Sequence, residues 1–320
     1  MAQLSTSGAQ TAGVLLKTIP KEQQLAIARE LIINLRAKFD VSAASVAVEL
    51  VADGDDSTLK YDLLDVLKSR IELGSPDEVV TLLTSFPKLL DQLVTLAGQH
   101  LDHPVNSIAI ESITVASETT DPDEQTGLGR VDPDEDDTTS NLLLQWLRFV
   151  KIAISSGHSL QRENEKGLFT SALKSLDNTN KSTALAARDL AFLLISSPAA
   201  QQNLDAVKTT IASLITARDA KLQQTLGYAL WMRLLAASDV VDMSQLNLSD
   251  DSYWEPLLSG LRNGDAERRK MCLDILKRSV ALAVEQERIG AVARTESGKS
   301  SKLFPALPTI SRSHISKMSG

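Results

Sequence analysis

The histidines are the first candidates for catalysis or metal binding, because the imidazole ring can act as a metal ligand and as a general base near neutral pH. The chain has four of them: His100, His103, His158 and His314. His100-x-x-His103, with Asp102 in between, could place two metal ligands at one end of a helix, but no third ligand is apparent. We therefore predict histidines that lie on the surface or near the C-terminus of a helix, where a cation complements the helix dipole.

Other arrangements that carry out chemistry are also incomplete. Cys272 is the sole cysteine, which rules out an intrachain disulfide or a thiolate-rich metal site, and its apolar surroundings predict a buried, unreactive thiol. Asp121-x-Asp123 opens like an EF-hand loop, but Thr126 and Asp132 stand where that loop needs glycine and glutamate. The sequence thus shows no catalytic site, and we expect this chain to bind no metal and no cofactor by itself.

One group of basic residues has the charge needed to contact phosphates. It begins at the end of one predicted helix, continues into the next, and consists of Arg262, Arg268, Arg269, Lys270, Lys277 and Arg278. Such residues bind nucleic acid by releasing the counterions of its backbone. The alternative is a solvated flank, because Glu267 and Asp274 lie at helical spacing from these bases and could form ordinary ion pairs.

Two amphipathic helices position this basic group, within residues 250–285. Asn263-Gly264-Asp265 ends the first helix and caps the second, since glycine suits the left-handed conformation and aspartate the N-cap. The apolar stripe of the first helix consists of Tyr253, Trp254, Leu257, Leu258 and Leu261, and that of the second of Met271, Leu273, Ile275, Leu276, Val280 and Val284. Each helix has one apolar side, so neither is stable alone. We expect Trp254 to anchor the core rather than to stack on a base.

The same stretch also carries a family resemblance, in the motifs Trp254-x-x-Leu257-x-x-Gly260-Leu261, Gly264-Asp265, Arg269-Lys270 and Leu273-x-Ile275-Leu276-Lys277-x-Ser279. It resembles a helical-repeat segment of large eukaryotic tRNA (guanosine-2'-O)-methyltransferases of the TAR RNA-binding protein type. In that family a long helical region precedes a knotted catalytic domain, which binds S-adenosylmethionine and methylates a guanosine of tRNA. Nothing after Glu285 resembles that domain. The resemblance therefore implies a scaffold for tRNA, with S-adenosylmethionine bound only by a catalytic domain elsewhere.

The acidity of the chain is concentrated in one segment. Residues 117–140 contain nine acidic residues and one base, so this segment accounts for the whole net charge of −8. It also contains two prolines, two glycines and almost no apolar residues. Such a sequence cannot bury enough surface to offset the entropy of ordering it. We predict a disordered acidic insert between two helical halves whose charges balance.

Composition and periodicity predict an all-α protein. Aromatic residues make up only 4% of the chain, while leucine and alanine are abundant, which favours helix over sheet. Apolar residues recur at helical spacing in about twelve segments, grouped in pairs of roughly 35–45 residues. That length is typical of HEAT and armadillo repeats. We predict an α-solenoid of such helix pairs, and two irregular helical bundles are the alternative.

Recognisable start and stop signals bound most of the predicted helices. The clearest begins at Ser57, a suitable N-cap, and ends at Gly74, with Leu59, Leu63, Leu67 and Ile71, together with Leu64, on its buried face. Further helices are predicted over residues 42–52, 142–155, 160–176, 182–196, 199–217 and 220–237. Residues 106–116 alternate in part between apolar and polar types, but no partner strand is apparent, so a helix is preferred there.

These observations divide the chain into four parts. We predict an N-terminal helical array (1–116), the acidic insert (117–140), a C-terminal helical array (141–286) and a basic, serine-rich disordered tail (287–320). No apolar run approaches the ~18 residues of a membrane span, and the first residues lack the features of a signal peptide. We interpret the chain as a cytoplasmic protein without a membrane partner, and a nuclear location is the alternative.

Two functions from different classes are consistent with the sequence. In the first, which the resemblance implies, the chain is a non-catalytic scaffold that helps a methyltransferase to bind tRNA. In the second, the chain is a HEAT-like scaffold that binds a peptide or a helix of a partner protein, without RNA. The distribution of surface charge distinguishes the two, because a contiguous basic stripe favours RNA, and mixed charge or an apolar groove favours protein.

Overall fold

The computed structural model describes residues 15–16, 18–52, 54, 56–102, 133–217, 220–246, 248, 251–263 and 265–296. Within these ranges, the side chains of residues 133–138, 251–252 and 289–296 are not described. All regular secondary structure in the described residues is helical, which confirms the all-α prediction. The chain forms two compact units, Met1–Ala206 and Val207–Gly320. The boundary falls inside the predicted C-terminal array.

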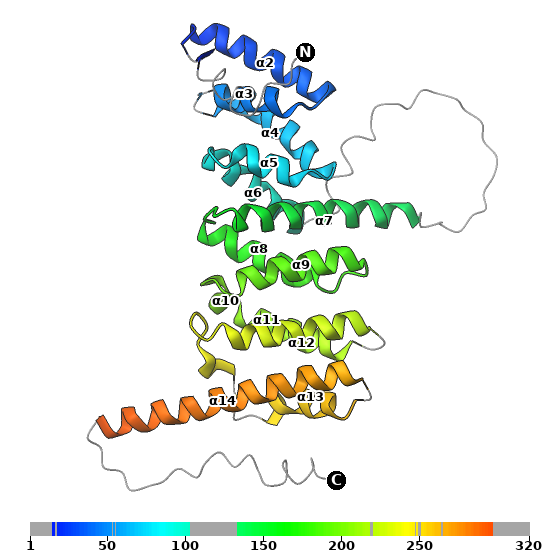
Figure 1. Ribbon diagram of the computed structural model, residues 1–320, viewed down its shortest axis with the longest axis vertical. Coiled ribbons are helices and arrows are strands. Elements are labelled where there is room, and N and C mark those ends of the chain that lie inside the picture. The colour runs from blue at the N-terminus through cyan, green and yellow to red at the C-terminus, as the bar shows by residue number, and fades with distance from the viewer. Residues whose placement is uncertain are drawn as a thin grey trace, which may run out of the picture. The chain divides into compact units, whose positions relative to one another are not determined.

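The first unit is an α-solenoid of HEAT-like helix pairs, as predicted (Figure 1). Each helix packs mainly against helices one or two places away in the chain. The helices of this unit are α2 (Lys21–Ala37), α3 (Val41–Val51), α4 (Ser57–Glu72), α5 (Pro76–Leu83), α6 (Pro87–Asp102), α7 (Pro133–Ser155), α8 (Arg162–Ser175), α9 (Lys181–Leu194) and α10 (Ala199–Gln202). Helix α11 (Leu204–Thr216) begins at the end of the first unit and continues into the second.

Helix α4 illustrates how the sequence pattern becomes packing. Its predicted apolar face is buried, with exposed fractions of 2% or less at Leu59, Leu63, Leu67 and Ile71. The N-cap, however, is Asp56 rather than Ser57, and its carboxylate accepts hydrogen bonds from the backbone N–H groups of the first turn. A carboxylate at this position also complements the positive end of the helix dipole.

Glycines with positive φ end two helices of the first unit. Gly74, with φ of 95°, follows α4, and Gly157, with φ of 89°, follows α7. After α7, the N–H of Gly157 bonds to Ile154 O, and the N–H of His158 bonds to Ala153 O. This pair of bonds is the Schellman motif, which requires a left-handed residue that glycine adopts without steric cost. The turn after Gly157 therefore has a fixed geometry.

Three helix boundaries differ from the predictions. Helix α7 begins at Pro133, nine residues before Leu142, because proline suits the first helical position and the acids that follow complement the dipole. Asn203 separates α10 from α11 within the predicted helix 199–217. Helix α14 extends past residue 286, to Glu296. The rest of the acidic insert, residues 106–116 and the tail from Ser297 lie outside the described residues.

The second unit consists of the remainder of α11, α12 (Lys221–Ala236), a 3-10 turn η1 (Met243–Leu246), α13 (Asp251–Leu261) and α14 (Ala266–Glu296). Helix α14 packs against both α12 and α13. The buried face of α14 contains Cys272, Ile275 and Ser279, each with an exposed fraction of 0%. The predicted stripe was therefore wrong at Leu273 and Val284, which are 40% and 60% exposed.

Two glycines in the second unit permit the close approach of helices. A Cβ atom on Gly260 of α13 would collide with Cys272 Sγ and would lie 2.7 Å from Tyr228 Oη. A Cβ atom on Gly227 of α12 would lie 3.0 Å from side-chain atoms of Leu214 and Ile215. Tyr228, on α12, is 3% exposed. The packing of α12, α13 and α14 thus depends on the absence of a side chain at Gly260.

Replacement of Gly260 by alanine tests this packing. We expect Gly260→Ala to lower the free energy of unfolding by about 1–3 kcal/mol, as overpacking does, although alanine is the better helix former. Urea unfolding followed by circular dichroism measures the change. Because the thiol is the nearest obstacle, Cys272→Ala in the same chain should recover a large part of the loss.

A matched control is available in α8 of the first unit. A Cβ atom on Gly167 would meet no atom within 4 Å, so Gly167→Ala should leave stability unchanged or raise it by up to about 1 kcal/mol. If Gly260→Ala raised stability, as helix propensity alone predicts for both glycines, the packing interpretation of Gly260 would be wrong.

Candidate functional site

The predicted basic group lies at the turn between α13 and α14. Asp265 caps α14, because its carboxylate accepts a hydrogen bond of 2.9 Å from the N–H of Glu267, as the sequence predicts. Arg262 follows α13 directly, and the other five residues lie on α14. The structure leaves five of the six side chains exposed, namely Arg262, Arg269, Lys270, Lys277 and Arg278.

Arg268 differs from the rest of the group because it points toward α12. Its side chain is only partly exposed, and its guanidinium donates a hydrogen bond to Gln224 Oε1. The guanidinium also lies close enough to Tyr228 and Cys272 to favour their ionised forms. Arg268 therefore joins two helices of the second unit, while its neighbours in sequence face the solvent.

Cys272 is the buried thiol that the sequence predicts, with an exposed fraction of 0%. Burial raises the pKa of this thiol above its usual value, and the hydrogen bond with Tyr228 and the charge of Arg268 oppose that shift only in part. Burial also raises the pKa of Tyr228, and Cys272 adds to the shift. Both groups are neutral near pH 7, so the thiol is not an activated nucleophile.

The exposed side of α14 carries charges of alternating sign. Glu267, Lys270, Asp274 and Lys277 follow one another at intervals of three, four and three residues, which places them along one face of the helix. Lys277 Nζ lies 3.9 Å from a carboxylate oxygen of Asp274. This face is therefore not a contiguous basic stripe, because Asp274 separates its two bases and Glu267 precedes them. The solvated flank that the sequence left as an alternative describes it better.

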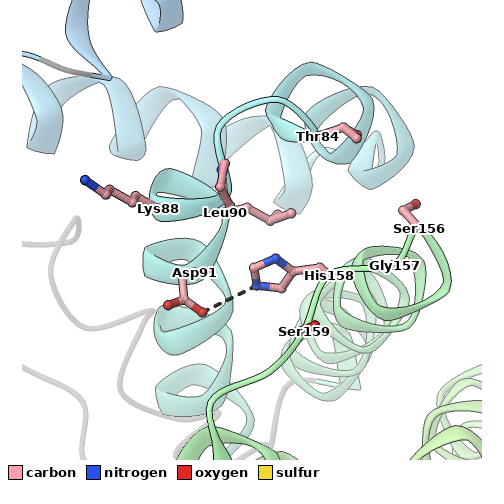
Figure 2. Close-up of a pocket in the computed structure, with 9 residues that line it drawn as sticks. Thr84, Lys88, Leu90, Asp91, Ser156, Gly157, His158 and Ser159 are labelled. Carbon is pink, nitrogen blue, oxygen red and sulfur yellow. Dashed lines mark ion pairs between the residues drawn. The ribbon is translucent and has the colours of Figure 1, made fainter.

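A cavity of about 410 Å³ lies in the first unit, beside the joint between α7 and α8. Its walls come from the end of α5, the first turns of α6 and the joint itself, with Thr84, Pro87, Lys88, Leu90, Asp91 and residues 156–159 as the lining (Figure 2). Figure 2 shows the ring of His158 facing Asp91 across this cavity. The glycine turn at Gly157 directs His158 toward α6.

His158 and Asp91 form the polar centre of the cavity. The His158 side chain is 9% exposed, and its Nε2 lies 3.4 Å from Asp91 Oδ1. Asp91 Oδ2 accepts a hydrogen bond of 2.6 Å from Gln161 Nε2. A histidine–aspartate pair beside hydroxyl groups has the composition of a hydrolytic triad, but within the described chain no serine or threonine hydroxyl is bonded to His158. The pair instead connects α6 to the α7–α8 joint.

His100, the other described histidine, packs against the core. It lies in the last turn of α6, and its ring stacks on Trp146 of α7 with a centroid distance of 5.0 Å. Burial lowers the pKa of His100, and the ammonium group of Lys68 lowers it further. His100 thus lies near the C-terminus of a helix, as predicted, but its lowered pKa favours the neutral ring over the cation that we expected to complement the dipole. His103 lies outside the described residues.

Helices α2 and α4 each expose a large apolar side chain close in sequence to the ion pairs that join them, and we call this region the α2–α4 face. Arg29 bonds to Asp56 at 3.4 Å, and Arg36 bonds to Asp62 at 2.8 Å, which ties α2 to α4. Ile33 lies between the two arginines on α2 and is 64% exposed, and Tyr61, next to Asp62 on α4, is 78% exposed. Each side chain is held on a fixed backbone and is open to solvent.

Sequence reasoning did not find the pairing of Asp91 with His158. The two residues are 67 positions apart, and no motif connects them. The available signal was the serine-glycine-histidine turn after a strongly apolar helix, since a glycine C-cap fixes the direction of the next residue.

In the part of the chain that the structure describes, no group of three His, Cys, Asp or Glu side chains is arranged so that it could hold a metal ion.

Comparison with known proteins finds similarity to one solved structure. No family model matches the chain, and no curated protein matches it. The archaeal HEAT-like repeats protein from Thermococcus onnurineus NA1 is similar over 96% of this chain and 94% of its own, with 12% identity and a TM-score of 0.31. A TM-score this low adds nothing to the fold assignment, which rests on helix packing. None of the helices, where described, is long and apolar enough to cross a membrane.

The pKa of His100 leads to a prediction about pH. Since the folded pKa lies below the unfolded value of about 6.5, the unfolded chain takes up the proton first as the pH falls. The contribution of neutral His100 to the free energy of unfolding is therefore full above about pH 6.5, and it is lost as the pH falls from there toward the folded pKa. The variant His100→Phe keeps a ring that can stack on Trp146 but cannot take up a proton.

We therefore expect a smaller loss of stability in His100→Phe than in the natural chain between about pH 7.5 and about pH 5.5. Urea unfolding at both pH values measures the difference, and the comparison cancels the titration of all other groups. An equal or larger pH dependence in the variant would contradict the assignment.

Proposed function

We propose that this chain is a non-catalytic helical scaffold that binds a partner protein. The observation that carries the proposal is the alternation of acids and bases on the exposed face of α14, through Glu267, Lys270, Asp274 and Lys277. A surface that binds nucleic acid accumulates positive charge, because each phosphate that it contacts is anionic. Here each base has an acid beside it. Mixed charge of this kind suits the polar rim of a protein–protein contact.

The α2–α4 face supports the same function in the first unit. Interfaces between proteins are enriched in aromatic residues and arginine, and a few such residues supply most of the binding energy. Tyr61 and Ile33 offer exposed apolar surface, and the ion pairs of Arg29 and Arg36 hold the two helices in register. A partner that buries an apolar side chain against Tyr61 and Ile33 fits this face.

Variants of this face test the proposal. Partner proteins that crosslink to the full chain in cells would be identified, purified and titrated against it by calorimetry. Ile33→Ala with Tyr61→Ala should weaken binding by at least about tenfold, the effect of losing one or two central contacts, without changing the unfolding curve. The matched control is Leu73→Ala, because Leu73 is also 78% exposed but lies at the end of α4. Equal affinity of all three chains would contradict the α2–α4 assignment.

A second candidate function is the one that the family resemblance implies. In it the chain holds tRNA while a catalytic domain outside this chain binds S-adenosylmethionine and methylates the ribose. The exposure of Arg262, Arg269, Lys270, Lys277 and Arg278 favours this candidate, since all five side chains are accessible to phosphates. Arg268 is a poor phosphate contact in this arrangement because Gln224 binds its guanidinium.

Two pairs of substitutions on one face of α14 distinguish the candidates. Binding of tRNA would be measured at several salt concentrations for the natural chain, for Lys270→Ala with Lys277→Ala, and for Glu267→Ala with Asp274→Ala. The protein scaffold predicts no binding of the natural chain even at low salt. Salt-dependent binding that the first pair weakens and the second strengthens would instead establish the tRNA function, because each phosphate contact contributes to the salt slope.

A further inference from the structure

The second unit contains an apolar pocket that none of the features above uses. It has a volume of about 270 Å³ and is formed by α11, α12, η1 and α13. Its lining consists of Lys208, Ile211, Ala212, Ile215, Trp231, Leu234, Leu246, Tyr253 and Pro256. Two aromatic rings and a proline ring therefore share one concave, largely apolar surface with aliphatic side chains.

Hydrogen bonds fix the aromatic walls of this pocket. Trp231 Nε1 donates to Tyr253 Oη at 3.1 Å, and the two rings meet edge to face with a centroid distance of 5.1 Å. Tyr253 Oη also lies 2.6 Å from Ser279 Oγ on α14, and Ser279 is fully buried. The polar atoms of both rings are thus satisfied inside the unit. The ring surfaces are shaped in advance for an apolar ligand, which lowers the entropy cost of binding.

The chemistry of the lining indicates a proline-rich ligand. Grooves lined by tryptophan and tyrosine bind segments of the form Pro-x-x-Pro, because the polyproline II helix exposes its proline rings and loses little entropy on binding. The chain itself contains such a segment, Leu303-Phe304-Pro305-Ala306-Leu307-Pro308, beyond the described residues. Its prolines stand at the required spacing, and its other side chains are apolar.

The length of the connecting chain allows this segment to reach the pocket. From Ser279, beside the pocket, α14 continues for 17 residues to Glu296, which is about 25 Å at 1.5 Å per residue. The pocket lies one helix away from α14, which adds a lateral distance of about 10 Å between packed helices. The straight line from the end of α14 back to the pocket is therefore about 27 Å. An extended chain at about 3.1 Å per residue covers about 28 Å by Pro305 and about 37 Å by Pro308.

The surface along this return path is also open. Past Ser279, no described side chain of α14 is buried, although Leu282 and Val284 are apolar. Val284 is 60% exposed. A chain that turns back at Glu296 would run beside these residues before it reached Tyr253.

We propose that the segment Leu303–Pro308 binds in the pocket between Trp231 and Tyr253 of the same chain. The segment acts as a tethered ligand, and a proline-rich segment of another protein would have to displace it. This inference goes beyond the proposed function and does not depend on it, because the α2–α4 face and its partner would remain if the pocket proved empty.

Photo-crosslinking of the full chain tests the proposal. The crosslinking residue p-benzoylphenylalanine would replace Phe304, and irradiated monomer would be digested and analysed by mass spectrometry. We expect crosslinks within one chain to the pocket segments, residues 208–215, 231–234 and 246–256. Crosslinks in the monomer that avoid these segments would overturn the proposal. Crosslinks to the pocket of a second copy, recovered as dimer, would overturn it in favour of self-association.

Two sets of variants provide matched controls. Ala212 is exposed on the pocket wall, so Ala212→Glu should abolish the pocket crosslinks without changing the unfolding curve. In the other set, Pro305→Ser with Pro308→Ser removes the polyproline II preference. A labelled peptide of residues 300–311 should then bind this full-length variant at least about tenfold more tightly than the natural chain, in which the tethered segment competes at high effective concentration. Equal affinity for the two chains would overturn the proposal.

Discussion

The first unit depends on the burial of one tryptophan. Trp146 of α7 is 2% exposed, stacks on His100 of α6 and meets Phe149 edge to face at 5.9 Å. Helix α7 packs against α4, α5 and α6, which precede the acidic segment, and against α9, which follows it. Helix α7 therefore joins the two parts of the first unit that the acidic segment separates in sequence. A helix without such tertiary packing is marginal in water.

The distribution of charge separates the structural role of a basic residue from a binding role. Arg268 and Lys270 are two positions apart on α14, yet Arg268 bonds to α12 while Lys270 lies among acids on the exposed face. In the same way, Arg36 connects α2 to α4. Ion pairs this exposed contribute little stability individually. They mark where α2 and α4 lie against each other, beside the exposed side chain of Ile33.

Local pattern predicted the helices, because a period of three to four residues depends only on nearby residues. The buried face of α4 was therefore correct at Leu59, Leu63, Leu67 and Ile71, and wrong only at Leu64, which is half-buried. The pattern failed on α14, where apolar residues lie on more than one side of the helix. Contact with α12 and α13 selects the side with Cys272 and Ser279 and leaves Leu273 exposed. For the same reason neither the Asp91–His158 pair nor the pocket around Trp231 could be predicted, since each joins elements distant in sequence.

Packing between near neighbours also determines how the first unit responds to force. Because each helix of this unit contacts mainly the helices one or two places away, the energy of a deformation is a sum of small terms, one for each interface. Small rotations at successive helix–helix interfaces add up along the array. The unit can therefore change its curvature while each pair of neighbouring helices stays in contact. The curvature of its surface can then change without the unfolding of any helix.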